Sequence, residues 1–250
     1  MSLPILSVIT VCYNSGATIS DTLASVAAQS YQAIEHLIVD GGSTDDTLSV
    51  VRRFPHVGPV ISEPDKGLYD AMNKGIDRAA GEVIGLLNSD DFYTDPNVLA
   101  AVMARFENPA VMAVYGDLQY VDAIDTNRTV RNWVAGEIPT SRLSRGWMPP
   151  HPAFFVRSSV YERYGRFDLS YRIGADVEFM LRVLARHRVP TVYLPRVLVK
   201  MRIGGLSNRS WANRLQLLRE FHRAYIANEP DYRFYTIPLR ILTKIPQFFK

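Results

Sequence analysis

The fold is decided by residues 5–47, which read ILSVITVCYNSGATISDTLASVAAQSYQAIEHLIVDGGSTDDT. Residues 5–13 and 34–40 are apolar and rich in β-branched side chains, so we interpret both as buried strands. Between them, the apolar residues of 17–29 recur at the spacing of a helix that packs on a sheet. Strand, helix and strand in this order predict a βαβ unit with parallel strands.

The same alternation continues along the first half of the chain. We expect strands at 57–62, 82–88 and 111–115, and helices at 67–80 and 95–106. Short loops between them predict a mostly parallel sheet that helices cover on both faces. Active sites of such sheets lie at the carboxyl ends of the strands, which here are residues 13–14, 40–42, 62–65 and 88–91.

The second half is less regular, with a helix expected at 175–187, a strand at 191–194 and an Arg-rich amphipathic helix at 211–226. The whole chain of 250 residues is 47% apolar and 21% charged, which excludes a disordered or low-complexity protein. The single cysteine, Cys12, favours a reducing, cytoplasmic location. We expect neither a membrane span nor a secretory signal.

The net charge of +3 hides a gradient from −8 over residues 1–100 to +5 over 101–200 and +6 over 201–250. This gradient predicts an acidic catalytic or metal-binding half and a basic half that faces phosphates or an anionic lipid surface. No motif of a nucleic-acid-binding module occurs, so we expect no nucleic-acid partner.

Carboxylates mark two of these strand ends. Asp90 and Asp91 follow an apolar strand, and their mutual repulsion suits a hard divalent cation beside them. Taken alone, the pair is explained more simply by a helix-capping turn before residue 95. Asp40 precedes two glycines, which permit either close approach of a ligand or an ordinary turn.

Asp176 opens the expected helix at 175–187, where free N–H groups stabilise a carboxylate. One interpretation is a structural acid paired with Arg182 or Arg172. The other is a general base, because deprotonating a hydroxyl requires a positioned acceptor.

Together, these motifs resemble the inverting family 2 glycosyltransferases of GT-A fold. The resemblance spans residues 5–207 and is carried by SVITVCYN, LIVDGGSTDDT, SEPDKGLYDAMNKG, LNSDD, HPAFF and ADVE, beginning at residues 7, 37, 62, 87, 151 and 175. It implies a Rossmann-like α/β domain over 1–207, with a nucleotide-sugar half (1–117) and an irregular acceptor half (118–207). Residues 208–250 would be a helical, basic tail.

The resemblance also implies residue roles on the nucleotide side. The backbone near Val11, together with Tyr13 and Asp40, would hold the uracil of a UDP-sugar, with Asp40 accepting its N3–H. Lys66 and Asp90 would lie along the nucleotide. Asp91, the last carboxylate of the LNSDD motif, would ligate Mn²⁺ or Mg²⁺.

On the sugar and acceptor side, the resemblance places Asp70 and Asn73 beside the donor sugar, which would be a hexose or N-acetylhexosamine. Asp176 matches the catalytic base, although Ala175 replaces the Glu that commonly precedes it. Weaker acceptor or loop contacts fall on three residues: His151, Glu178 and Ser207.

The implied reaction is a single displacement that inverts the anomeric carbon. The acceptor would be a saccharide, free or lipid-linked, in the synthesis of cell-surface polysaccharide such as lipopolysaccharide at the cytoplasmic face of the inner membrane. Residues 234–250 mix aromatic, aliphatic and basic side chains and suit either a membrane-interface segment or packing within the protein. A sugar nucleotidyltransferase, disfavoured by the missing glycine-rich loop, and a non-catalytic scaffold are the alternatives.

Overall fold

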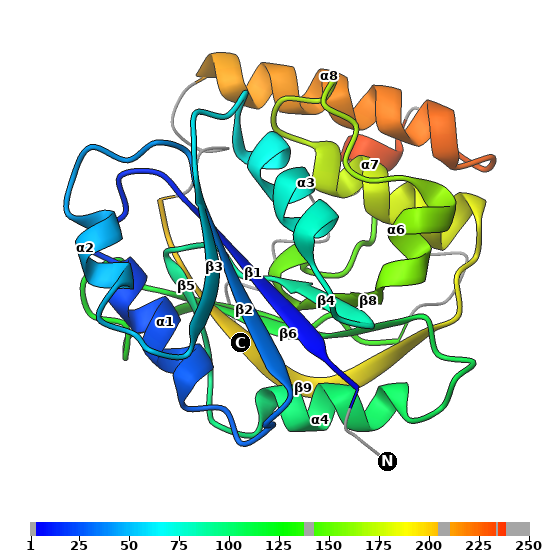
Figure 1. Cartoon of the computed structure of the whole chain (residues 1–250). Coiled ribbons are helices and arrows are strands. Elements are labelled where there is room, and N and C mark those ends of the chain that lie inside the picture. Colours follow the sequence, from blue (N-terminus) through cyan, green and yellow to red (C-terminus); the bar gives the residue numbers. More distant parts are fainter. Residues whose placement is uncertain (1–3, 138–142, 205–210, 234, 239–250) are drawn as a thin grey trace.

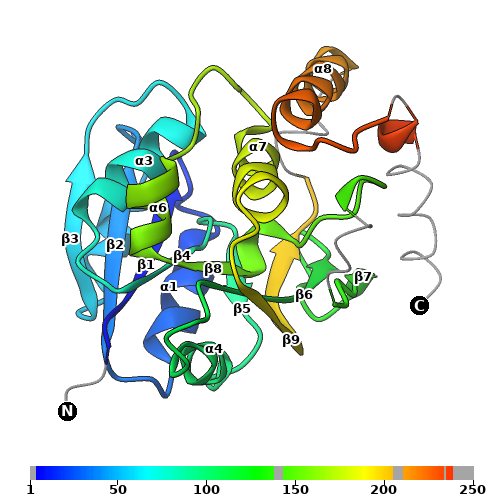
Figure 2. The ribbon, with the colours of Figure 1, turned by 90° about the vertical axis from the view of Figure 1, so that its right-hand side faces the viewer.

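The computed structural model describes residues 4–137, 143–204, 211–233 and 235–238. Within these residues a nine-stranded sheet has the strand order β3-β2-β1-β4-β8-β6-β9-β5, and β7 pairs with β6 beside this path. Helices lie on both sides of the sheet (Figures 1 and 2).

The first half forms the predicted series of parallel strands. Strand β1 is parallel to β2 and to β4, and β2 is parallel to β3. The strand predicted at 57–62 has these same bounds in the structure. The elements are β1 (Leu6–Cys12), α1 (Ile19–Ala27), β2 (Ile34–Asp40), α2 (Thr47–Val51), β3 (Val57–Ser62), α3 (Leu68–Arg78) and β4 (Val83–Leu86).

The second half extends the same sheet with a mixture of strand directions. Strand β8 lies antiparallel between β4 and β6 and so joins the two halves. Strand β9 is parallel to β6 and antiparallel to the short β5. The elements are β5 (Asp91–Tyr93), α4 (Val98–Phe106), β6 (Ala113–Val121), β7 (Thr129–Trp133), the 3-10 turn η1 (His151–Ala153), β8 (Phe154–Arg157), α6 (Ser158–Tyr164), α7 (Ala175–Leu181), the π-helical turn η2 (Arg182–Arg186), β9 (Thr191–Arg202) and α8 (Trp211–Asn228).

Strand β9 is much longer than the strand predicted at 191–194. That prediction ended before Pro195, because proline has no N–H for a sheet ladder. In the structure β9 continues to Arg202, and its pairing with β6 shifts register between Tyr115 and Asp117, opposite the proline. An irregularity of this kind accommodates proline inside a strand. The predicted helix at 175–187 is also corrected, because it becomes π-helical from Arg182 onward.

Two apolar layers confirm that both faces of the sheet are covered. Side chains of α3, α6, α7 and α8 pack with β1, β2 and β6 in one cluster. On the other face, side chains of α1 and α4 pack with β1, β4 and β9, while α1 and α2 pack against β1 and β2. Figure 2 shows α7 and α8 on one side of the sheet and α1 and α4 on the other. Among the described helices, none combines the length and the apolar character that crossing a bilayer requires.

Candidate active site

The loops that follow β1, β2 and β4 meet at one edge of the sheet. Cys12 and Asp40 are paired at the ends of β1 and β2. The hydroxyl of Ser89, after β4, donates to the hydroxyl of Ser15, after β1, over 2.8 Å. The structure thus brings the ends of β1, β2 and β4 together, and with them the segments that carry Tyr13, Asp40 and Asp90. Val11 is buried in β1, while Tyr13 is 63% exposed.

Asp40 is the best-supported carboxylate at this edge. It is fully buried at the end of β2. Its oxygens accept hydrogen bonds from two hydroxyl groups, those of Ser62 at 2.7 Å and of Ser43. They also accept from two backbone N–H groups, those of Ser43 at 3.0 Å and Gly42 at 3.2 Å. Burial alone would raise the pKa of Asp40, but the bonds from Ser43, Ser62 and Gly42 outweigh it and hold the pKa below 3.8. Asp40 is therefore an ionised, oriented acceptor.

A second carboxylate, which the sequence did not single out as a site residue, lies against this turn. A Cβ added to Gly41 would come 2.4 Å from Asp65 Oδ2, so the absence of a side chain at Gly41 lets Asp65 approach. Asp65 also accepts a hydrogen bond from the Gly67 N–H at 2.7 Å. The available signal was its place after strand 57–62, at a nominated strand end.

The two residues predicted beside the donor sugar have polar partners within the protein. Asp70 Oδ2 accepts from the Lys66 N–H at 2.9 Å and lies 3.7 Å from Lys74 Nζ. Asn73 donates to the Phe167 carbonyl at 2.9 Å and accepts from the Phe167 N–H at 3.0 Å. Asn73 therefore fastens α3 to the loop before α7, while the Lys66 side chain is exposed.

The neighbouring carboxylates after β4 have opposite environments. Asp90 is half-buried, whereas Asp91 is fully buried in β5 and does not cap the following helix, which begins at Val98. Burial, and then the charge of Asp90, raise the pKa of Asp91 well above 3.8, although Asn88 and Arg202 lower it. Arg202 donates to the Asp90 carbonyl at 2.6 Å and pairs with Asp21, so it closes this turn from β9.

Unsatisfied oxygens at this turn fit a divalent cation. In the part of the chain that the structure describes, Asp91 Oδ1 and Asn88 Oδ1 are buried and have no hydrogen-bond partner. Such oxygens are costly unless a donor or a cation satisfies them. No group of three or more His, Cys, Asp or Glu side chains surrounds a metal position among the described residues. This donor set fits an ion that takes one or two protein oxygens and completes its shell with substrate phosphates, as Mg²⁺ usually does.

Asp176, at the start of α7, is oriented by two residues from distant segments. The hydroxyl of Tyr69 lies 2.9 Å from Asp176 Oδ1, and His151 Nδ1 lies 3.3 Å from Oδ2. Burial, and then the charge of Asp176, raise the pKa of Tyr69 well above 10, so this hydroxyl stays protonated and donates. The Asp176 side chain remains 18% exposed. It is therefore a fixed acceptor that a ligand hydroxyl is able to reach.

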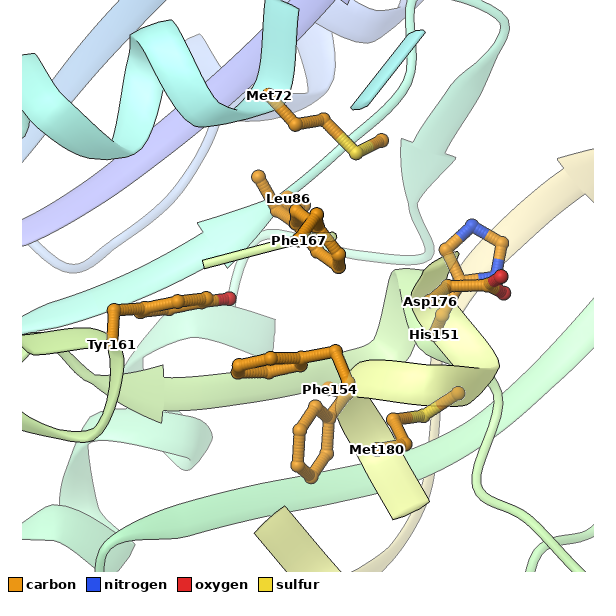
Figure 3. Close-up of a pocket in the computed structure, with 9 residues that line it drawn as sticks. Met72, Leu86, His151, Phe154, Tyr161, Phe167, Asp176 and Met180 are labelled. Atoms are coloured by element: carbon orange, nitrogen blue, oxygen red, sulfur yellow. The ribbon is translucent and has the colours of Figure 1, made fainter. Parts of the chain in front are cut away.

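A small apolar pocket adjoins Asp176 (Figure 3). Asp176 and His151 supply its polar edge, and the remaining wall is apolar or aromatic: Met72, Leu86, Phe154, Tyr161, Phe167, Phe179 and Met180. The apolar wall limits water around the carboxylate, which strengthens its interaction with an approaching hydroxyl.

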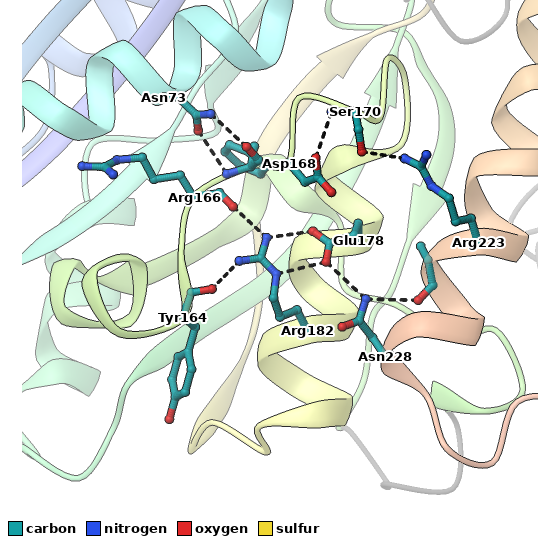
Figure 4. A network of polar contacts seen from close by, with 11 residues as sticks. Asn73, Tyr164, Arg166, Asp168, Ser170, Glu178, Arg182, Arg223 and Asn228 are labelled. Carbon is teal, nitrogen blue, oxygen red and sulfur yellow. Dashed lines mark hydrogen bonds and ion pairs between the residues drawn. The ribbon is translucent and has the colours of Figure 1, made fainter.

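Glu178 does not face this pocket. It is buried and forms an ion pair with Arg182, whose Nη2 lies 2.7 Å from Glu178 Oε2, and Asn228 of α8 donates to Glu178 Oε1 at 3.2 Å. Arg182 also donates to the carbonyls of Tyr164 and Arg166 (Figure 4). The interpretation of Asp176 as a structural partner of Arg182 was therefore wrong. The environment of Glu178 corrects the weaker prediction of an acceptor contact, because both of its oxygens bond within the fold.

Sequence reasoning missed Tyr69 and Arg202 as supports of the site. Tyr69 reaches Asp176 across 107 positions of the chain, and Arg202 reaches Asp90 across 112. No local pattern indicates a partner at that distance. The predicted loop contact Ser207 lies outside the described residues.

Comparisons with known proteins identify the family. Residues 7–165 match the family described as Glycosyl transferase family 2. The chain is 38% identical over 188 residues to a glycosyltransferase of Mycobacterium tuberculosis, covering 72% of this chain and 69% of that protein. It is 33% identical over 214 residues to the PGL/p-HBAD biosynthesis glycosyltransferase of Mycobacterium bovis, covering 83% and 81%.

Solved structures show the same fold at low sequence identity. Residues 1–349 of TarS from S. aureus, in complex with UDP, give a TM-score of 0.68 at 17% identity, covering 94% of this chain and 69% of that one. A mannosyltransferase from Pyrobaculum calidifontis, in complex with GDP-Man and Mn²⁺, gives 0.68 at 21% identity, covering 96% and 69%. The fold and the family match thus define a glycosyltransferase of GT-A type. The chain belongs to glycosyl transferase family 2, which decides against a nucleotidyltransferase.

Proposed function

We propose that this enzyme transfers a sugar from a UDP-sugar to a hydroxyl group of a saccharide acceptor, with inversion at the anomeric carbon. The observation that carries this proposal is the Asp176 carboxylate, which Tyr69 and His151 orient and which remains partly exposed beside an apolar pocket. A carboxylate in this setting is suited to receive the acceptor's proton.

In the proposed reaction, the acceptor oxygen forms a bond to the anomeric carbon while the bond from that carbon to the diphosphate oxygen breaks. The electron pair of the broken bond leaves with UDP, and the acceptor proton passes to Asp176. No covalent sugar–enzyme intermediate forms, so the anomeric configuration inverts. Asp40 is buried and already accepts four hydrogen bonds, so it would accept the N3–H of uracil in exchange for one of its present donors. The exposed Tyr13 would lie against the base.

The carboxylates after β4 would hold Mn²⁺ or Mg²⁺ beside the diphosphate. The support is the donor chemistry of this turn, which offers the half-buried Asp90 and the unpartnered oxygens of Asn88 and Asp91. When bound, the ion would stabilise the negative charge that develops on the leaving diphosphate. Asp91 retains its predicted role as the direct ligand. Its complete burial predicts that metal binding is accompanied by a rearrangement of this turn.

Solved structures of similar fold support a nucleotide-sugar as the donor. TarS is described in complex with UDP and with UDP-GlcNAc, and the Pyrobaculum mannosyltransferase with GDP-Man. A carboxylate such as Asp40 would accept an N–H from uracil or from guanine, so the choice of UDP in this proposal follows the resemblance and the UDP complexes of TarS.

The test measures release of nucleoside diphosphate from a panel of UDP-sugars and GDP-mannose with Mn²⁺. We expect release from at least one UDP-sugar and its loss with a chelator. Asp91→Ala is expected to weaken both metal-dependent nucleotide binding and turnover, with the exposed Glu107→Gln as a matched control. Release from GDP-mannose alone would overturn the UDP assignment, and no release from any donor would favour the scaffold.

The acceptor is proposed to be lipid-linked, in the synthesis of cell-surface glycans at the cytoplasmic face of the membrane. A relative of 33% identity is named for PGL/p-HBAD biosynthesis. In the described residues, α8 exposes Leu215, Leu218 and Ile226 on the same helix as Arg219 and Arg223. Apolar and cationic side chains on one helix suit the surface of an anionic bilayer.

Vesicle flotation tests this membrane proposal. Binding to vesicles with phosphatidylglycerol should fall as salt rises, since each cation near the surface contributes about 1 kcal/mol that salt screens. Deletion of residues 234–250, a predicted interface segment that lies mostly outside the described residues, should weaken flotation while release of UDP survives, because α8 remains in the truncated protein. Undiminished flotation of the truncated protein would assign binding to α8 or to another surface.

A further inference from the structure

The last described helix, α8, reaches the loop that precedes the proposed base. The Glu220 carboxylate of α8 accepts hydrogen bonds from three consecutive backbone N–H groups: Oε1 from Arg172 at 2.9 Å, and Oε2 from Ile173 at 2.9 Å and from Gly174 at 2.8 Å. Gln216 donates to Oε1 at 3.0 Å, so each carboxylate oxygen has two donors. These four bonds account for the hydrogen-bonding capacity of a carboxylate.

The opposite side of this loop is held by α3. The Tyr69 hydroxyl lies 2.7 Å from the Ile173 carbonyl and 2.9 Å from Asp176 Oδ1. Gly174 starts the helix, because its carbonyl accepts from the Glu178 N–H at 3.1 Å. Thus the N–H groups of the loop point to α8, one of its carbonyls points to Tyr69, and Asp176 follows two residues later.

The Glu220 carboxylate is suited to this task by its burial and charge. Only 8% of the residue is exposed. Burial tends to raise the pKa of Glu220, but the bonds from Ile173, Arg172, Gln216 and Gly174 lower it below 4.5, so Glu220 is ionised at neutral pH. Hydrogen bonds to a charged, buried acceptor are about twice as strong as bonds between neutral groups.

We propose that Glu220 is a positioning residue for the base: it fixes residues 172–174 from α8 and thereby sets the place of Asp176 relative to the bound sugar. This inference rests on the proposed function, in which Asp176 receives the acceptor proton. It also assigns a catalytic purpose to α8, which lies beyond the residues 7–165 that match the family.

The test is Glu220→Gln, which keeps the shape of the side chain but replaces one acceptor oxygen with an NH₂ group. If the amide oxygen keeps the bonds to Ile173 and Gly174, its NH₂ group faces two donors, the Arg172 N–H and the Gln216 amide. We expect kcat for donor hydrolysis to fall about tenfold while KM for the donor stays within twofold, because misplacing a reacting group slows the chemical step without weakening nucleotide binding. Hydrogen exchange should accelerate at the amides of residues 172–174.

Two control variants separate positioning from general stability. Gln216→Ala removes one donor to Glu220 but leaves its three backbone bonds, so kcat should fall less than in Glu220→Gln. Glu229→Gln changes another buried glutamate, just after α8, whose carboxylate accepts from the Asp231 N–H at 3.2 Å. Burial raises the pKa of Glu229, so its charge costs stability at neutral pH, and the neutral Gln should leave Tm equal or higher without the selective loss of kcat.

The outcomes distinguish this inference from the proposed function. If the wild-type enzyme turns over no donor, the proposed function is refuted, and the catalytic part of this inference with it. Hydrogen exchange at residues 172–174 still tests the contact between Glu220 and this loop. The positioning role would be overturned if Glu220→Gln kept the kcat and the hydrogen-exchange rates of the wild type. It would also be overturned if kcat and donor affinity fell in parallel. If Glu220→Gln does not fold, Glu220→Asp keeps the charge one methylene further away and should give an intermediate kcat. A folded Asp variant with wild-type kcat would equally overturn it.

Discussion

The carboxylate at the end of β2 and the carboxylate at the start of α7 are held in different ways. Asp40 takes most of its bonds from Gly42 and Ser43 in the turn that follows it, and one from Ser62 on the neighbouring strand β3. Asp176 depends on Tyr69, 107 positions away, and on His151. A local turn fixes Asp40, whereas tertiary packing fixes Asp176. The nucleotide side of the site is therefore expected to be robust, and the base side sensitive to distant substitutions.

The largest expected effect comes from the base itself. Asp176→Ala should reduce kcat by roughly 10²–10⁴, the usual contribution of general-base catalysis, while nucleotide affinity stays nearly intact. Steady-state kinetics of UDP release and calorimetric titration with UDP and Mn²⁺ check the two halves of this prediction. Near-normal transfer by this variant would remove Asp176 from the mechanism. A loss of UDP affinity would show that the nucleotide side and the base side of the site are not independent.

A smaller effect is expected from the strand-end carboxylate. Asp40→Asn should cost about 2 kcal/mol of the free energy of unfolding at pH 7, since it weakens charge-assisted hydrogen bonds to a buried acceptor. Because the pKa of Asp40 is below 3.8 in the folded protein, its ionised form stabilises the fold fully above pH 3.8. That contribution is lost as the pH falls through the folded-state pKa.

Urea denaturation at several pH values measures this contribution. The difference in stability between the wild type and Asp40→Asn should shrink below pH 3.8, whereas the exposed Glu107→Gln should show no comparable difference. A difference that stays constant with pH would mean that Asp40 is held by shape and packing rather than by its charge.

The same contrast explains what was predictable from sequence. Strands β1, β2 and β3 and the position of Asp40 follow from local apolar runs and a turn, and the structure confirms them. Strand β8 was missed, because an antiparallel insertion between β4 and β6 leaves no periodic signal in four residues. The place of Asp176 at a helix start was predicted. Its supports, Tyr69 and Glu220, lie far away in sequence and are visible only once α3 and α8 are packed.

The smallest expected effect sharpens this point. Tyr69→Phe removes a single hydroxyl that lies against both the Ile173 carbonyl and Asp176, and it keeps the aromatic packing with Phe167, whose ring centre is 5.4 Å away. We expect a loss of about 1 kcal/mol in stability and about a three- to tenfold lower kcat, with unchanged KM for the donor. Tyr69 and Glu220 bond opposite sides of the same loop, so their effects on kcat should not add in the double variant Tyr69→Phe/Glu220→Gln. Additive losses would show that α3 and α8 act on Asp176 independently, and the base side would then consist of two separate supports rather than one clamped loop.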